Sequence, residues 1–167
     1  MSPAHDIPIS RDLVLLGGGH SHVAVLRAFG MRPMAGVRLT LISRDEETPY
    51  SGMLPGLIAG HYRRDEAHID LGPLAAFAKA RFYPEPALGL DLVNRQVLCA
   101  HRPPVPFDVL SMDIGSTPVT AGIPGVTEYA LAIKPVDRFL AAWEDLKTRA
   151  LTPAGPRRVV VVGGGAG

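Results

Sequence analysis

The apolar positions near the start of the chain predict a strand, a glycine turn, a helix and a second strand. Residues 13–16 form an apolar run that ends in three glycines, and residues 23–29, VAVLRAF, are apolar on most faces. Gly30 interrupts this helical pattern, and residues 37–43, VRLTLIS, are again typical of a buried strand. The order predicts a βαβ unit whose two strands are adjacent and parallel, joined by a right-handed crossover.

The middle of the chain predicts shorter elements. Residues 45–60 read as a loop, residues 71–80 as a short helix, and residues 82–98 as a small antiparallel β portion. Residues 107–118, FDVLSMDIGSTP, predict a strand that closes on a Gly-Ser turn. The predicted fold class is α/β, with three layers, a parallel sheet and a small antiparallel β portion.

The last third of the chain predicts a helix and then a repeat of the opening pattern. Lys134-Pro135 begins a helix through about Arg149, because proline is tolerated at the first helical position and apolar residues follow at helical spacing. After the linker LTPAGP, the run RRVVVVGGGAG reads as a strand, Val159–Val162, that enters a second glycine turn. No helix follows Gly167, so we expect a truncated piece whose exposed C-terminal strand favours homodimerisation.

Composition narrows the functional classes. With 47% apolar and 20% charged residues among 167, the chain is expected to be globular. Its net charge of +1 does not indicate binding to nucleic acid. The N-terminus lacks the features of a secretory signal, and no apolar run is long enough to span a bilayer. A single cysteine, Cys99, cannot form an internal disulfide, which fits a reducing, cytoplasmic location.

The chemistry begins at GGGHSH, residues 17–22. Gly17 permits a tight turn after the strand, and Gly19 lets a pyrophosphate approach the backbone, where the N–H groups at a helix start favour an anion. His22 stands where the dinucleotide fingerprint has its third glycine. The turn therefore either binds nucleotide phosphate or is structural. We interpret His20 and His22 as capping or packing residues rather than metal ligands.

The end of the second strand is the place where the fingerprint has an acid that binds ribose. This sequence has Ser43 there, followed by Arg44 and Asp45. A serine hydroxyl can still hydrogen-bond a sugar, and an arginine suits a phosphate. The alternative interpretation is a solvated strand end.

Several segments together resemble a known superfamily. Two strand-glycine units, at Gly17 and Gly163, and VLSMDIGSTP just before IPGV are similar to the pyridine nucleotide-disulfide oxidoreductase flavoproteins. TPYSGMLPGLIAGHY and IKPVDRFL resemble more particularly the NADH dehydrogenase-like FAD-containing branch, including the proteins fused to selenide, water dikinase. In this superfamily an NAD(P)H-binding domain interrupts the FAD-binding domain.

The resemblance implies a Rossmann-like FAD/NAD(P)-binding fold, a domain organisation and two cofactors. Residues 1–10 would be a tail, residues 11–152 the first segment of the FAD-binding domain, and residues 153–167 a linker with the first strand and glycine turn of the NAD(P)H-binding domain. FAD would be the cofactor of this segment, and NAD(P)H that of a longer parent protein, which could associate peripherally with a membrane.

The resemblance also implies positions for the cofactor contacts. It assigns no catalytic residue, and we expect no metal site. The superfamily pattern places the FAD pyrophosphate on Gly17, Gly18, Gly19 and His20, the adenosine ribose near Ser43 and Arg44, adenine near Ala87, the flavin near Met53, Leu54, Pro55, Gly115 and Ser116, and the nicotinamide dinucleotide at Gly163 and Gly165. Asp113 departs from the alanine usual at its position, and an acid beside a diphosphate would be repulsive.

The loop at Met53 to Pro55 argues against a disulfide reductase, because Gly52 and Met53 hold the place of the redox-active cysteine and Cys99 lies far away in the sequence. The expected function is that of an FAD-dependent NAD(P)H oxidoreductase that passes hydride to flavin and electrons to a quinone or another acceptor. Two alternatives remain: a nucleotide-binding module without redox turnover, and a structural or interaction domain. The 167-residue piece alone is expected to lack NAD(P)H oxidation and to hold FAD weakly or not at all.

Overall fold

The computed structural model describes residues 8–118, 122–156 and 158–163. The chain divides into two compact units, which are described separately. The first comprises Met1–Tyr50 and His68–Gly115, and the second comprises Ser51–Ala67 and Ser116–Gly167.

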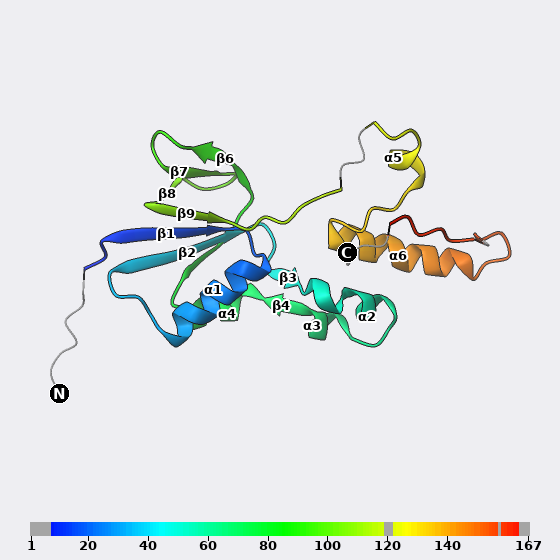
Figure 1. Cartoon of the computed structure of the whole chain (residues 1–167), viewed down its shortest axis with the longest axis horizontal. Helices are drawn as coiled ribbons and strands as arrows, with labels where there is room; N and C mark the ends of the chain where they lie inside the picture. The colour runs from blue at the N-terminus through cyan, green and yellow to red at the C-terminus, as the bar shows by residue number, and fades with distance from the viewer. Residues whose placement is uncertain (1–7, 119–121, 157, 164–167) are drawn as a thin grey trace. The chain divides into compact units, whose positions relative to one another are not determined.

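The first unit is built around a four-stranded parallel sheet (Figure 1). Its strands lie in the order β5 (Arg81–Pro84), β2 (Val37–Ser43), β1 (Arg11–Leu16) and β9 (Val109–Met112). Strand β1 pairs in parallel with both β2 and β9, and β2 pairs in parallel with β5. The prediction that residues 13–16 and 37–42 form adjacent parallel strands is confirmed.

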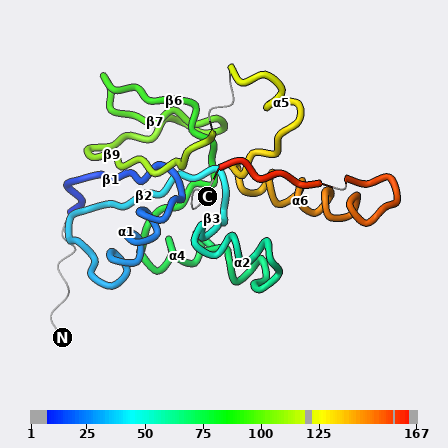
Figure 2. Tube along the Cα trace, turned by 45° about the vertical axis from the view of Figure 1, so that its right-hand side comes forward, coloured from blue at the N-terminus to red at the C-terminus, as the bar shows by residue number. Residues whose placement is uncertain are grey.

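Helices cover one face of this sheet. Helix α1 (His20–Met31) and helix α4 (Leu71–Phe77) lie on the same side of it, as Figures 1 and 2 show. They form a core with alternate residues of the strands, because successive strand side chains point to opposite faces. The buried members of this core are Leu15, Leu26, Leu39, Leu41, Leu71 and Ala78.

A small antiparallel sheet covers the other face and completes the three predicted layers. Its strands are β6 (Ala87–Asp91), β7 (Gln96–Cys99) and β8 (Val105–Pro106), and it packs through a second core of Val14, Leu16, Ile42, Val97 and Val105. One boundary of the prediction is wrong, because residues 82–84 belong to β5 of the parallel sheet. The antiparallel part therefore begins at Ala87 rather than at Phe82.

The segment predicted as a loop at residues 45–60 contains regular structure. Strand β3 (Glu47–Pro49) pairs with β4 (His68–Asp70) in the first unit. In the second unit the chain continues through a 3-10 turn, η1 (Ser51–Met53), helix α2 (Leu54–Ile58) and helix α3 (Arg64–Ala67). Pro55 fits because it lies in the first turn of α2, where a missing N–H costs no helical hydrogen bond.

The rest of the second unit contains helix α5 (Val126–Tyr129) and helix α6 (Val136–Ala150). Helix α6 confirms the helix expected from Lys134 to Arg149, with Pro135 at its N-cap. The strand expected at Val159–Val162 does not form: these valines have no strand partner among the described residues and are 59 to 95% exposed. The homodimer expected through this segment would pair it with a second chain and stays a prediction. Gly165 and Gly167 lie outside the described residues.

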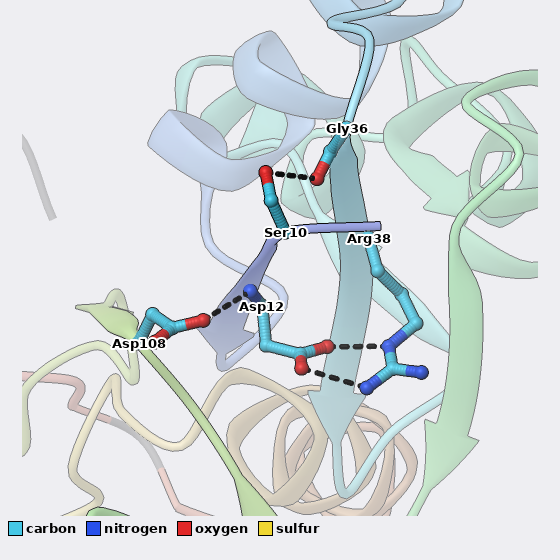
Figure 3. Close-up of polar contacts among 5 residues, drawn as sticks. All are labelled: Ser10, Asp12, Gly36, Arg38 and Asp108. Carbon is cyan, nitrogen blue, oxygen red and sulfur yellow. Dashed lines mark hydrogen bonds and ion pairs between the residues drawn. The ribbon is translucent and has the colours of Figure 1, made fainter. Parts of the chain in front are cut away.

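Polar contacts connect β1 to its neighbours β2 and β9 at the amino ends of the strands (Figure 3). The Asp12 carboxylate accepts hydrogen bonds from Arg38 on β2 through Nε and, at 2.6 Å, through Nη2. The Asp108 carboxylate accepts the Asp12 N–H at 2.7 Å. The hydrogen bond and the charge of Asp12 raise the pKa of Arg38. These contacts stabilise the end of the sheet opposite to the glycine turn.

Candidate functional site

The glycine turn lies where the topology of the parallel sheet reverses direction. From β1 the chain crosses to β2 on one side, whereas β9 pairs with β1 on the other side. The carboxyl ends of β1 and β9 are level, because Leu16 is opposite Met112. In open α/β sheets such a switch point, outside the carboxyl ends of the strands, is where ligands bind.

The first two glycines of the turn are required by their surroundings. Gly17 has φ of +96°, a conformation that favours glycine, and its N–H donates to the Ile42 carbonyl at 2.7 Å. An ideal Cβ on Gly17 would also overlap the Asp113 carbonyl and lie 2.9 Å from the Ile114 Cα. On Gly18 a Cβ would lie 2.5 Å from a Leu71 methyl group. The backbone of the turn is therefore packed directly against its neighbours.

Gly19 is the N-cap of α1 and faces Asp113. Its φ of −67° is accessible to any residue, but an ideal Cβ would overlap the Asp113 carboxylate. This carboxylate accepts the Ser21 N–H at 2.9 Å, and the Asp113 backbone carbonyl accepts the Gly19 N–H at 3.2 Å. The space beside Gly19 that the fingerprint assigns to a phosphate thus holds an acid of the chain itself. The glycine alone does not indicate a phosphate.

His22 lies beneath the turn, with only 1% of its surface exposed. Its Nδ1 lies 2.6 Å from the Gly17 carbonyl oxygen, and its Nε2 lies 3.0 Å from Oγ of Ser111 on β9. Because a carbonyl oxygen only accepts, Nδ1 carries the proton, and in the neutral ring Nε2 accepts from the Ser111 hydroxyl. His22 therefore joins the glycine turn to β9, and the packing role expected for it agrees with this geometry.

His20, the first residue of α1, has a different environment. Its ring contacts Tyr50 edge-on, with the ring centroids 4.8 Å apart. Its Nε2 is buried and has no hydrogen-bond partner among the described residues. The same part of the chain holds no cluster of three or more potential metal ligands.

The expected ribose position lies beside the turn. Ser43 is buried, its hydroxyl donates to the Asp45 carbonyl at 2.9 Å, and its Oγ lies 3.1 Å from an ideal Cβ on Gly18. Arg44 is exposed and pairs with the Asp45 carboxylate, with Nη2 and Oδ2 2.6 Å apart. The Ser43 hydroxyl keeps its acceptor capacity for a sugar, while the Arg44 charge is matched by a neighbouring acid.

The expected adenine position follows from β5. The Glu85 N–H donates to the Ser43 carbonyl at 2.9 Å, so the chain leaves β5 beside the end of β2. Ala87 begins β6 two residues later and is exposed. The topology thus brings Gly17 to His20, Ser43, Arg44 and Ala87 to one edge of the first unit.

The remaining candidate residues are not gathered at that edge by any described contact. Gly115, which ends the first unit, has φ of +74°, and Ser116 begins the second unit, where its Oγ accepts from Lys134 Nζ at 3.5 Å. The second unit also contains Met53, Leu54 and Pro55, of which Leu54 is buried, and the exposed Gly163, with φ of +102°.

Two other features of the described residues bear on chemistry. Cys99 is half-buried on β7, and burial raises the pKa of its thiol, which disfavours the reactive thiolate. In the described ranges, no helix is both long and apolar enough to cross a bilayer.

Sequence reasoning missed the hydrogen bonds to Ser111 and Ser21. A signal was present at Ser111, because it is the polar residue of the strand VLSM. Asp113 was noted as an unusual charge, but its partner lies 92 residues earlier in the sequence. Only the pairing of β1 with β9 brings the two together.

Known proteins support this picture of the fold. No family model matches the chain. A curated relative, the NADH dehydrogenase-like protein YutJ of Bacillus subtilis, is 25% identical over 166 residues, which cover 93% of this chain and 42% of that protein. The chain thus spans less than half of this relative.

Two solved structures match this fold over about a third of their own length. The sulfide:quinone oxidoreductase of Aquifex aeolicus matches with a TM-score of 0.70 and 22% identity, over 86% of this chain and 33% of that one. NDH2 of Plasmodium falciparum in complex with NADH matches with a TM-score of 0.70 and 18% identity, over 86% of this chain and 30% of that one. The chain is a homologue of an NADH dehydrogenase-like protein, and it has the α/β fold of the matching third of these two structures.

Proposed function

We propose that this chain provides the part of an FAD-dependent NAD(P)H oxidoreductase that binds the adenosine diphosphate half of FAD. The observation that carries the proposal is the glycine turn at the switch point between β1 and β9, in a chain homologous to an NADH dehydrogenase-like protein. Residues 11–152 would form the first segment of the FAD-binding domain, and residues 153–167 would begin the NAD(P)H-binding part.

The proposed contacts follow the edge described above. The turn from Gly17 to His20 would bind the pyrophosphate through backbone N–H groups other than those of Gly17 and Gly19, which donate to backbone carbonyls. Ser43 and Arg44 would lie near the ribose, and Ala87 would contact adenine. Met53, Leu54, Pro55, Gly115 and Ser116 are proposed for the flavin end, and Gly163 and Gly165 for the nicotinamide dinucleotide. The site fits a pyrophosphate in its topology and backbone, but only if the Asp113 carboxylate leaves the α1 N-terminus.

Bound FAD would supply the hydride chemistry, and the residues of this chain would bind and orient it. NAD(P)H is the proposed donor, because one matching structure contains NADH, and a quinone is a proposed acceptor, because another is named for its quinone. We propose a cytoplasmic location. These statements concern a whole oxidoreductase, of which this chain matches about a third to two-fifths by length.

Competition between nucleotides tests the proposal. The chain is titrated with FAD in a calorimeter, first alone and then in the presence of excess ADP. If the ADP half of FAD binds at the turn, ADP competes with FAD, and adenosine competes less well. FAD binding that excess ADP does not weaken would contradict the proposed site. If neither nucleotide binds, the turn is structural.

A second candidate function is a nucleotide-binding module without redox turnover. One observation favours it. The candidate residues at the edge of the first unit are those proposed for pyrophosphate, ribose and adenine, which together make up an adenosine diphosphate group, and none of them is proposed for the flavin. To separate the two functions, the chain is mixed with FAD, free FAD is removed by gel filtration, and the reduction of a dye by NADH is measured. Turnover by the retained flavin supports the oxidoreductase, and nucleotide binding without turnover supports the module.

A further inference from the structure

The N-terminus of α1 already holds an anion, which the chain itself provides. The Asp113 carboxylate accepts the Ser21 N–H at 2.9 Å and fills the space beside Gly19. The Asp113 backbone carbonyl accepts the Gly19 N–H. The N–H groups and dipole at a helix start favour a negative charge, and the carboxylate meets that preference as a phosphate would.

No cation offsets this carboxylate within the described residues, because Asp113 takes part in no ion pair there. Its nearest partners belong to the backbone of the turn and of α1. A nucleotide pyrophosphate at the same N–H groups would therefore meet a full negative charge. Two like charges about 4 Å apart repel strongly enough to weaken binding by at least about fivefold, and more where water is excluded.

We propose that Asp113 determines how much the phosphates of a nucleotide contribute to binding at this turn. Its carboxylate competes with the pyrophosphate for the Ser21 N–H, so the ligand must displace it. An adenosine without phosphates does not meet this competition. The inference rests on the proposed function, because it concerns the same nucleotide site, and it identifies Asp113 as a residue that sets specificity by the charge of the ligand.

Two substitutions separate the charge of Asp113 from its shape. Asp113→Asn removes the charge and keeps an oxygen that accepts the Ser21 N–H, so the cap of α1 is preserved. Asp113→Ala also opens the space beside Gly19. Asp108→Asn is the matched control, because the Asp108 carboxylate also accepts one backbone N–H, from Asp12 at 2.7 Å, at the opposite end of β1.

The experiment is calorimetric titration of the wild-type chain and the three variants with ADP and with adenosine. Circular dichroism verifies that each variant folds, and Asp113→Asn carries the test if Asp113→Ala does not fold. We expect both Asp113 variants to bind ADP at least about fivefold more tightly than the wild type. Adenosine affinity should change by less than about twofold, and Asp108→Asn should behave as the wild type.

The outcomes distinguish this inference from the proposed function. If the wild type binds ADP and Asp113→Asn binds it equally or more weakly, the competition does not exist and the inference fails. An equal gain for ADP and adenosine also overturns it, because the effect would not involve phosphates. If no protein, Asp113→Ala included, binds either ligand, the proposed nucleotide site itself is wrong.

Discussion

Gly19→Ala is the substitution that tests most sharply why the third residue of the turn is glycine. The φ of −67° and ψ of 171° at Gly19 are accessible to alanine, so the substitution introduces no backbone strain. The new methyl group would overlap the Asp113 carboxylate and force it away from the Ser21 N–H. In this structure the obstacle is Asp113, and no ligand is needed to explain the glycine.

The cost can be worked out from three terms. Alanine is a poorer N-cap than glycine by about 0.5 kcal/mol. Relief of the overlap costs about 1 kcal/mol or more, and loss of a hydrogen bond to a charged acceptor costs about 1.5 kcal/mol. Gly19→Ala should therefore lower the free energy of unfolding by about 3 kcal/mol in the wild type. In an Asp113→Ala background only the N-cap term of about 0.5 kcal/mol remains.

Urea denaturation of the wild type, both single variants and the double variant gives this coupling. Far-ultraviolet circular dichroism is the suitable signal, because the one tryptophan, Trp143, belongs to the second unit. Gly89→Ala is the control, because its Cβ would lie 3.9 Å from the nearest atom, a methyl group of Leu98. Equal costs of Gly19→Ala with and without the Asp113 side chain would refute the argument.

Three further outcomes are expected. His22→Ala should cost about 3 kcal/mol in urea denaturation, because it leaves buried polar groups unpaired, whereas Ser111→Ala should cost about 1 kcal/mol; a His22→Ala cost below that of Ser111→Ala would contradict the bridge between them. Arg38→Met should cost about 1 kcal/mol through loss of the partly exposed Asp12 pair, with a larger effect at low than at high salt, and no salt dependence would count against an ionic contribution. Because burial raises the pKa of the Cys99 thiol, less thiolate is present at pH values near the ordinary pKa, and iodoacetamide should react more slowly with the folded than with the urea-unfolded chain; equal rates would show that the thiol is not protected.

The βαβ unit could be predicted because its signals are local. Strand β2 is buried along most of its length and its sequence, VRLTLIS, is rich in β-branched and apolar residues, and the glycine turn marks the start of α1. The boundary at Phe82 was harder to predict, because β5 is a short strand with two exposed and two partly buried residues. Its parallel pairing depends on β2, some forty residues earlier, and the local pattern does not carry that information.

The candidate site shows the same division. The turn and Ser43 were placed by their order along the chain, since each follows a strand, and Ala87 was placed by the superfamily resemblance; as nucleotide contacts they stay predictions. The orientation of Asp113 and the bonds of His22 depend on β9 lying beside β1, which only the folded sheet establishes. The valines at residues 159–162 have the composition of a strand, but a strand also needs a partner, and the described residues provide none.

The central claim is that a nucleotide binds at the turn between β1 and α1. Titration of the isotope-labelled chain with ADP, followed by two-dimensional amide NMR, tests it residue by residue. The account predicts saturable shifts of the amide signals from Gly18 to Ser21 and of Asp113, with the distant turn at Asn94 unchanged. Unchanged signals at the glycine turn at saturating ADP, or shifts confined to other parts of the chain, would contradict the account.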